Sequence, residues 1–486
     1  MIKVFKFLSI VILCCSFQLC TAQNEWDNLP WIVIGDSTDL NENPNAILTG
    51  WIKIKGTEEP VSRASISLEL FKYFDYTNQF GEYYLEMPKG KYRLLVRHVG
   101  MKAQYHRVNI LSNGVLDIEL EPGSTILDEI VISSRPIDSN IKGSLSGITK
   151  LSIQEVKTLP TLMGEVDILK SLQLMPGVSS VGEGSSGFNV RGGRTDQNLV
   201  LLNDVPIFNT SHALGFISAF NQDVVNDFSL YKGNVPANFG GRASSVLEVT
   251  TRRGDFEKWK YQGGVGPISS RFTAEGPIKT GKTSLLLAGR TSYSNWVLKT
   301  VRDPNVKKSL LSFYDAFTSL NHRFSANSTA DVTYYTSKDF FQFSNQFGYT
   351  WDNSIVNAKW RSFSNRKASP VTSFSYGHFK NTLFDPSGVE ASQLSNTLNY
   401  FQFKETVNYA PDEKQNIVIG IESVAYIPKP ELQTGYKGNP NIPSKKADKN
   451  NGIEFSVFAN DDYQVSENFS FSAGLRYSHY IHVGAD

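Results

Sequence analysis

Two glycine-rich stretches match patterns that hold phosphate groups. Gly276–Thr283 fits GxxxxGK[ST] letter by letter, and Gly182–Gly187 fits GxGxxG, with Asp204 seventeen residues beyond it. A phosphate-binding loop needs a buried strand before it and a helix after it, because the N-terminus of the helix holds the phosphate. Ser284–Arg290 instead has the pattern of a second strand, and no βαβ unit surrounds the other stretch. We predict a tight hairpin at the first stretch, a Gly/Ser turn at the second, and nucleotide binding at neither.

The histidines and carboxylates do not have the spacing of a catalytic or metal site. His479 and His482 are three residues apart in a strand-like run, so their side chains point to opposite faces. Asp36, Asp39 and Glu42 lie in an acidic segment without the spacing of an EF-hand loop. No GxSxG sequence occurs. We therefore expect no enzyme activity, no cofactor and no metal site.

The N-terminus has the features of a secretory signal peptide. Lys3 and Lys6 precede an apolar stretch from Phe7 to Cys20, and Cys20-Thr21-Ala22 is a small-x-small cleavage site. We predict that residues 1–22 are removed and that the mature chain begins at Gln23. All three cysteines lie in the removed segment, so the exported chain must fold without disulfides.

Composition narrows the functional class and divides the chain. The net charge of +1 argues against a nucleic-acid binder, since no excess of Lys and Arg is present to replace counterions. After residue 22 no apolar run approaches the ~18 residues of a membrane helix, whereas alternating strands escape such a scan. Residues 1–254 contain 22 aromatic residues, about 9%, and residues 255–486 contain 37, about 16%. Two kinds of structure are thus expected to meet near Gly254.

The C-terminal part alternates between apolar and polar residues. In Phe469–Tyr477 every second residue from Phe469 is apolar, and Ile417–Ile421 and Ile453–Val457 repeat the pattern. In a soluble sandwich the apolar face packs inside, whereas in a membrane barrel it faces lipid and the polar face lines the lumen. The alternation alone leaves both interpretations open.

The N-terminal part contains a small β domain and a linker. Residues 23–47 are polar and expected to be irregular, and strand-like runs separated by glycine turns then extend over residues 48–122. This pattern predicts a small β-sandwich. In the linker 123–136, Leu127–Ile132 is a β-prone run that either joins the domains or adds as an edge strand to a partner's sheet.

The segment 152–253 resembles the plug domain of TonB-dependent receptors. Five blocks occur in that family's order, namely Leu172–Val178 (LPGV), Phe188–Gly193 (IRG), Leu199–Pro206 (VLVDGVP), Asp227–Gly233 (IEVLKG) and Ala237–Thr251 (YGG…I.V.T). Asp204-Val205 stands where the family often has Asp-Gly. The plug residues matched in this way are Pro176, Gly177, Arg191, Gly192, Gly193, Asp204, Lys232, Gly233, Gly240, Gly241 and Arg242.

Two N-terminal matches point to the Bacteroidetes type of this family. Gln79–Leu85 and Gly90–Val96 resemble its carboxypeptidase regulatory-like domain. The run Asp128, Glu129, Ile130, Val131, Ile132 resembles the TonB box DEVVV, with Ile replacing Val twice. The resemblance implies a plug domain at residues 137–254 and a partial outer-membrane barrel at residues 255–486.

The resemblance implies an outer-membrane importer driven from the inner membrane. The box would pair with periplasmic TonB by strand addition, and the ligand would be a siderophore, cobalamin, a peptide or an oligosaccharide, with a surface lipoprotein as a further partner. Arg191, Arg194 and Arg242 are expected to pack against the wall rather than to contact ligand. The alternative is an exported β-rich binding or adhesion protein that does not transport.

The length limits the barrel. Residues 255–486 have room for roughly 10–11 strands, and a 10-strand barrel with strands ~4.8 Å apart and tilted ~40° has a radius of about 10 Å. A plug of roughly 120 residues, with a radius of gyration of ~13–14 Å, would not fit inside it. We therefore expect a mainly β fold, with an N-terminal β-sandwich, an α+β plug domain and the first half of an antiparallel 22-stranded transmembrane β-barrel, in a C-terminally truncated sequence.

Overall fold

The computed structural model describes most of the chain in two compact units, which divide near Gly123. The described residues are 29–36, 44–55, 60–62, 64–68, 73–78, 80–98, 101–121, 148–157, 167–182, 187–325, 327–362, 368–412, 414–448, 450–466 and 469–484. No helix among them is long and apolar enough to cross a lipid bilayer.

The first unit is a sandwich of two β-sheets. One sheet has the order β1-β7-β6-β3-β4, and the other has the order β5-β2-β8, with β9 also paired to β2. Apolar residues from both sheets, such as Leu48, Ile66 and Leu94, are fully buried between them. The strands are β1 (Trp31–Ile34), β2 (Asn45–Ile54), β3 (Ser65–Leu68), β4 (Tyr73–Tyr76), β5 (Glu82–Pro88), β6 (Gly90–Arg97), β7 (Gln104–Ile110), β8 (Gly114–Val115) and β9 (Ile118–Leu120).

The sandwich begins earlier than the sequence analysis predicted. Residues 23–47 were expected to be irregular, but β1 pairs in parallel with β7, from Trp31 opposite Arg107 to Ile34 opposite Ile110. The run Trp-Ile-Val-Ile has high β propensity but only four residues, too few to show an alternating pattern. The guanidinium of Arg107 lies 4.3 Å from the centre of the Trp31 ring, and this contact helps to hold the short edge strand.

The second unit starts with the plug, an α+β domain around a mixed sheet of order β10-β17-β18-β13-β14. Phe228, Leu230, Leu247 and Val249 of this sheet are completely buried. The domain contains the short helix α4 (Ile168–Gln173), which the Asp167 carboxylate caps by accepting from the Lys170 N–H at 3.0 Å. The elements are β10 (Ile148–Ser152), α3 (Ile153–Lys157), α4, β11 (Val178–Ser180), β12 (Phe188–Val190), η1 (Thr195–Gln197), β13 (Asn198–Leu202), β14 (Val205–Pro206), β15 (Ser211–His212), η2 (Ala213–Gly215), β16 (Ile217–Ser218), β17 (Val225–Tyr231) and β18 (Ser245–Thr251).

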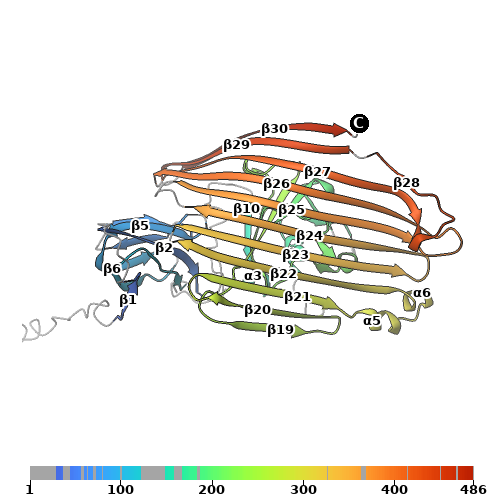
Figure 1. Ribbon diagram of the computed structural model, residues 1–486, viewed down its shortest axis with the longest axis horizontal. Helices are drawn as coiled ribbons and strands as arrows, with labels where there is room; N and C mark the ends of the chain where they lie inside the picture. The colour runs from blue at the N-terminus through green and yellow to red at the C-terminus, as the bar shows by residue number, and fades with distance from the viewer. Residues whose placement is uncertain are drawn as a thin grey trace, which may run out of the picture. The chain divides into compact units, whose positions relative to one another are not determined.

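A large antiparallel sheet follows, in which eleven strands lie side by side in chain order and β28 pairs with β27 (Figure 1). The sequence analysis predicted roughly 10–11 strands, and this prediction is confirmed. The strands are β19 (Lys260–Val265), β20 (Ser269–Lys279), β21 (Thr283–Ser292), β22 (Leu310–Ser325), β23 (Ser328–Phe343), β24 (Phe347–Ser362), β25 (Ala368–Asp385), β26 (Ser392–Asp412), β27 (Gln415–Gly435), β28 (Lys445–Lys446), β29 (Asn450–Ser466) and β30 (Phe469–Gly484).

The sequence that matches a phosphate-binding loop is a hairpin. Its residues run from the end of β20 into β21, with Lys279 opposite Thr283. Gly281 has φ +70°, which suits glycine at the turn, and Lys282 N–H donates to the Lys279 carbonyl at 2.9 Å. No helix follows the loop, so the prediction of a hairpin is confirmed. The GxGxxG stretch lies mostly outside the described residues.

The large sheet buries its polar face and exposes its apolar face, which is the reverse of a sheet in a soluble protein. On β22 the buried side chains include Asp315, Ser319 and Asn321, whereas Tyr314, Leu320 and Phe324 are exposed. The same alternation recurs on the next strands, and on β30 Leu475 is 78% exposed. A soluble sandwich would bury its apolar face, so this pattern is that of a transmembrane barrel wall.

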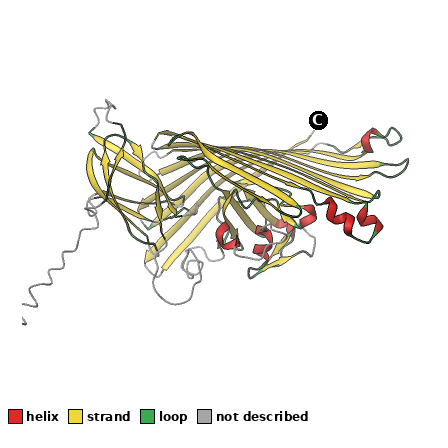
Figure 2. Ribbon diagram, turned by 90° about the horizontal axis from the view of Figure 1, so that it is seen from below, coloured by secondary structure: helices red, strands yellow, loops and turns green. Residues whose placement is uncertain are grey.

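The plug packs against the polar face of this sheet (Figure 2). One apolar cluster joins plug residues such as Phe220 and Phe228 to Leu286, Phe317 and Ile355 of the wall strands. Apolar contact is thus concentrated where the plug sits, while the rest of this face is polar.

The longest connections between wall strands lie at one end of the sheet. At one end lie residues 293–309, which contain α5 (Asn295–Thr300) and α6 (Pro304–Lys307), and residues 436–449, which contain η3 (Tyr436–Gly438) and β28 (Figure 1). At the other end β20–β21 and β26–β27 are joined by two or three residues. In outer-membrane barrels the short turns are periplasmic and the long loops extracellular.

Candidate functional site in the plug and at the sheet wall

Five of the predicted plug residues come together at one turn region. The Arg191 N–H donates to the Gly177 carbonyl at 2.9 Å, and Lys232 Nζ donates to the Pro176 carbonyl at 3.1 Å. A Cβ on Gly233 would lie 2.6 Å from an Arg191 guanidinium nitrogen, so a larger residue there would displace the Arg191 side chain. Partial burial and the nearby Arg191 charge lower the pKa of Lys232. The sequence blocks around LPGV, IRG and IEVLKG thus form one structural unit.

Two further predicted glycines allow close packing. A Cβ on Gly193 would lie 2.2 Å from Ser244 Oγ, and one on Gly240 would lie 2.4 Å from Arg476 Nε of β30. Arg476 also contacts Glu422 of β27 at 2.6 Å. Gly240 therefore lets the plug approach an ion pair on the wall, as close backbone approach requires.

Asp204 makes the most direct contact between a predicted residue and the wall. Asn203 and Asp204, with φ 51° and 69°, form the two-residue turn between β13 and β14, and the Asp204 carboxylate pairs with Lys359 of β24. The turn residues are therefore Asn203-Asp204, one residue before the Asp204-Val205 pair that was matched to Asp-Gly. Asn and Asp both tolerate the left-handed conformation that this turn requires. Burial would raise the pKa of Asp204, but Lys359 and Lys404 hold it well below its usual range.

Glu248 lies beside this ion pair. Burial and the neighbouring Asp204 charge raise the pKa of Glu248 to about 8. At neutral pH the cluster therefore combines one ionised and one protonated carboxyl with Lys359 and Lys404. Lys404 also donates to the Asn238 carbonyl of the plug at 3.2 Å, so both lysines hold the plug to the wall.

A second set of ion pairs lies where the plug chain enters the sheet. Arg252 pairs with Glu275 of β20, and Arg253 contacts Asp331 of β23 at 3.1 Å. Asp331 also accepts from Arg361 of β24 at 2.5 Å. These partners are charged and mostly buried, so they fix the direction in which the chain passes from plug to wall.

Other predicted residues lie apart from these contacts. Arg194 and Arg242 are exposed, and their recorded polar contacts are local, to Asp196 at 3.4 Å and to the Gly241 carbonyl at 2.8 Å. Gly192 and Gly241 have φ +80° and +79° with no atom near a Cβ, so turn geometry selects glycine there. Asp128–Ile132 lies outside the described residues.

Several residues at the wall contacts have no recognisable signal in the sequence. Lys359 and Lys404 look like ordinary polar positions of alternating strands, and the spacing of one strand cannot show what faces them across the lumen. His212, which is completely buried against the wall, also went unnoticed, because a single histidine in a loop has no spacing signal. Within the described part of the chain, no group of three or more His, Cys, Asp or Glu side chains is placed to hold a metal ion.

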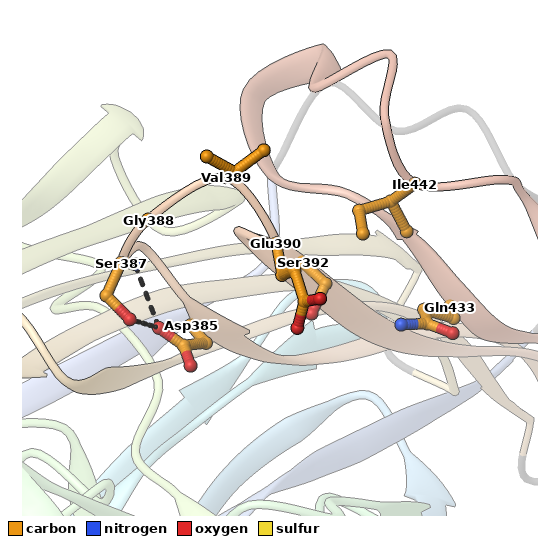
Figure 3. Close-up of a pocket in the computed structure, with 8 residues that line it drawn as sticks. All are labelled: Asp385, Ser387, Gly388, Val389, Glu390, Ser392, Gln433 and Ile442. Carbon is orange, nitrogen blue, oxygen red and sulfur yellow. Dashed lines mark hydrogen bonds between the residues drawn. The ribbon is translucent and has the colours of Figure 1, made fainter.

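A polar cavity of about 610 Å³ lies at the end of the wall with the long connections (Figure 3). The β25–β26 connection contributes Asp385, Ser387 and Glu390, and Gln433 and Ile442 complete the opposite side. Asp385 accepts from the N–H and the hydroxyl of Ser387 at 2.8 and 2.5 Å, which stabilises the connection. Its carboxylates and hydroxyls suit a polar ligand, but no buried polar group points into it.

Two family models match parts of the chain. Residues 48–132 match the CarboxypepD_reg-like domain, and residues 146–246 match the TonB-dependent receptor plug domain. No curated protein matches the sequence.

Solved structures of two receptors and a transporter have a similar fold. A ferric enterobactin receptor from Pseudomonas aeruginosa is 16% identical, with a TM-score of 0.53 over 70% of this chain and 58% of that one. A siderophore receptor from Acinetobacter baumannii is 15% identical, with a TM-score of 0.54 over 72% of this chain and 59% of that one. A copper transporter is 11% identical, with a TM-score of 0.55 over 70% and 56%. The chain thus spans less than two thirds of the length of these proteins.

The two domain matches agree with the described geometry. The CarboxypepD_reg-like match covers the β-sandwich except β1 and the start of β2, and the plug match covers most of the domain that packs against the polar face of the large sheet. The predicted resemblance is therefore confirmed: the chain has the domains and the fold of a TonB-dependent receptor, with a carboxypeptidase regulatory-like domain, a plug and a barrel wall.

Proposed function

We propose that this protein is a TonB-dependent outer-membrane receptor that imports a scarce ligand with energy from the inner membrane. The observation that carries the proposal is a plug held by buried ion pairs against the polar face of a sheet whose other face is apolar. An apolar outer face suits lipid, and a plugged polar interior prevents leakage until the plug is moved. An adhesion protein without transport would not need a plug of this kind.

The ligand is proposed only by class. The similar structures include siderophore receptors and a copper transporter, and the candidates from the sequence are siderophores, cobalamin, peptides and oligosaccharides. The long connections and their polar cavity would face outside the cell, where a surface lipoprotein could deliver ligand. The short turns would face the periplasm.

The energy-coupling segment is Asp128–Ile132, which we propose pairs with periplasmic TonB as an added strand. Strand addition uses backbone N–H and C=O groups, so removing one N–H and restricting φ with proline should disrupt it. Ile130→Pro should weaken binding of the purified chain to the periplasmic domain of TonB by about tenfold or more, measured by calorimetry. Ile137→Pro, one residue beyond the linker and outside the segment, should bind normally.

Two results would count against this assignment. Equal binding by wild type and Ile130→Pro would show that the segment is not the paired strand. Equal loss in Ile130→Pro and Ile137→Pro would show that linker shape, rather than strand pairing, controls the interaction.

A further inference from the structure

His212 lies in a plug hairpin that touches three wall strands. Its imidazole is completely buried, with Nδ1 2.8 Å from Oδ2 of Asp339 on β23 and Nε2 3.1 Å from Oδ2 of Asp315 on β22. Nδ1 is hydrogen-bonded to Asp339, whereas Nε2 lies at ion-pair distance from Asp315 without hydrogen-bond geometry, so both ring nitrogens face carboxylates that a positive imidazolium would attract.

The surrounding charges are balanced only if the histidine is positive. Arg290 of β21 contacts Asp315 at 2.7 Å and donates to the Ser218 carbonyl of the plug at 2.8 Å. The side chains of the four charged partners are at most 4% exposed, namely those of His212, Arg290, Asp315 and Asp339. Two carboxylates beside one guanidinium would leave an unpaired buried negative charge, which is costly, and a positive His212 neutralises it. The Phe313 ring stacks on the imidazole at 4.5 Å and 2°, which also favours a cation.

The hairpin has a conformation that needs external support. Ala213 and Leu214 have φ 53° and 58°, and Gly215 follows with φ 98°. Left-handed residues other than glycine are strained and persist where surrounding contacts hold them. Asp339 provides such a contact, because its second carboxylate oxygen accepts from the Ala213 N–H at 3.2 Å while the first faces His212.

We propose that His212 is a positioning residue which, as an imidazolium, locks the plug hairpin 211–218 onto wall strands β21, β22 and β23. The lock releases when the histidine loses its proton, because the cluster then carries an uncompensated negative charge against a strained turn. The inference concerns how the plug is held and does not depend on TonB coupling.

The direction of the pH dependence follows from the environment of His212. Burial alone would lower the pKa of His212, but Asp339 and Asp315 raise it above its ordinary value. A raised pKa means that the stabilisation is complete below about pH 6.5 and is lost as the pH rises through the pKa of the docked state. The other ionisable groups around the cluster are Arg290 of β21, Tyr335 of β23 and Asp167 at the start of α4, whose charge interacts with Arg290. Lys170 of α4 also touches the hairpin, because its Nζ donates to the Phe216 carbonyl at 3.4 Å.

Hydrogen exchange of residues 208–220 in the purified chain tests the proposal. The ratio of exchange rates between a variant and the wild type at one pH cancels the intrinsic effect of pH on exchange. His212→Gln should exchange about tenfold faster or more at pH 6, and this ratio should fall towards one by pH 10. His212→Arg, which is planar and permanently charged, should restore protection at both pH values.

The matched control is His322→Gln. His322 lies on β22, within 2.8 Å of the Thr283 hydroxyl, and its replacement should leave residues 208–220 unchanged. A ratio for His212→Gln that stays constant from pH 6 to pH 10, or Arg behaving like Gln, would overturn the proposal and leave only a packing role.

The wild type alone gives a second test if His212→Gln does not fold. Its protection at residues 208–220 should fall about tenfold or more between pH 6 and pH 10, relative to the intrinsic rates, while that of Val225–Tyr231 should not. Parallel changes in both segments would contradict a local lock.

Discussion

The ion pair between Asp204 and Lys359 gives the sharpest quantitative prediction. Its side chains are 26% and 12% exposed, and the pair joins the plug turn to wall strand β24. Lys359→Met removes the cation and leaves Asp204 with the more distant Lys404 as its counter-charge. Breaking a buried pair costs ~3–5 kcal/mol. Because Asp204 is partly exposed and Lys404 remains, we expect about 2–3 kcal/mol here.

Asp204→Asn should cost less than Lys359→Met, about 1 kcal/mol at pH 7. The pKa of Glu248 is about 8 because of burial and the Asp204 charge. Removing that charge lowers the pKa of Glu248, so Glu248 ionises and replaces Asp204 as the partner of Lys359. The double variant Asp204→Asn/Glu248→Gln removes this replacement and should be about as unstable as Lys359→Met.

Hydrogen exchange of residues 198–206 measures these free energies. A loss of 2–3 kcal/mol corresponds to roughly 30- to 150-fold faster exchange, and 1 kcal/mol to about fivefold. The reasoning fails if Asp204→Asn is as destabilising as Lys359→Met, or if adding Glu248→Gln to Asp204→Asn has no effect.

Two packing predictions test the fold around the site. Phe228→Ala should destabilise the plug by about 3–5 kcal/mol, because Phe228 is fully buried in the cluster shared with the wall. The midpoint of urea unfolding measures this, with Phe216→Ala at an exposed position as the control. Equal midpoints for the two variants would refute the prediction. Gly254→Ala should lower the stability by about 1–3 kcal/mol, because the added Cβ would lie 2.5 Å from the Leu285 carbonyl oxygen. Gly289→Ala, where no atom is closer than 3.7 Å to the added Cβ, should have a much smaller effect on the same urea midpoint.

The sequence predicted the repeating parts of the fold well. The wall strands alternate over long runs, and the glycine and proline turns mark their ends, so the number of strands followed from local pattern. The plug blocks were recognised because their turn residues have strict backbone requirements, as at Gly177 and Gly192 with φ +80°. The sequence could not decide between a soluble and a membrane sheet. The burial of Asp315 and the exposure of Leu475 supplied that answer.

The contacts between plug and wall were beyond the reach of local patterns. Asp204 and Lys359 are 155 residues apart, and His212 and Asp339 are 127 apart. Each residue alone is compatible with a solvated surface, and only the fold brings the opposite charges together in a buried place. The short strand β1 was missed for a different reason, since four residues are too few to establish a period.

Thiol cross-linking in isolated outer membranes tests the central claim, a plug seated on the polar face of a lipid-embedded sheet. Asn353 Nδ2 on β24 lies 3.4 Å from the Asn209 carbonyl of the plug, whereas Val356 is on the opposite, exposed face. The signal peptide is predicted to take all native cysteines with it, so engineered pairs should react without background. With a short bifunctional reagent, the pair Asn209→Cys/Asn353→Cys should cross-link in the outer-membrane fraction, and Asn209→Cys/Val356→Cys should not. A protein found only in the soluble fraction, or equal cross-linking of both pairs, would contradict the account.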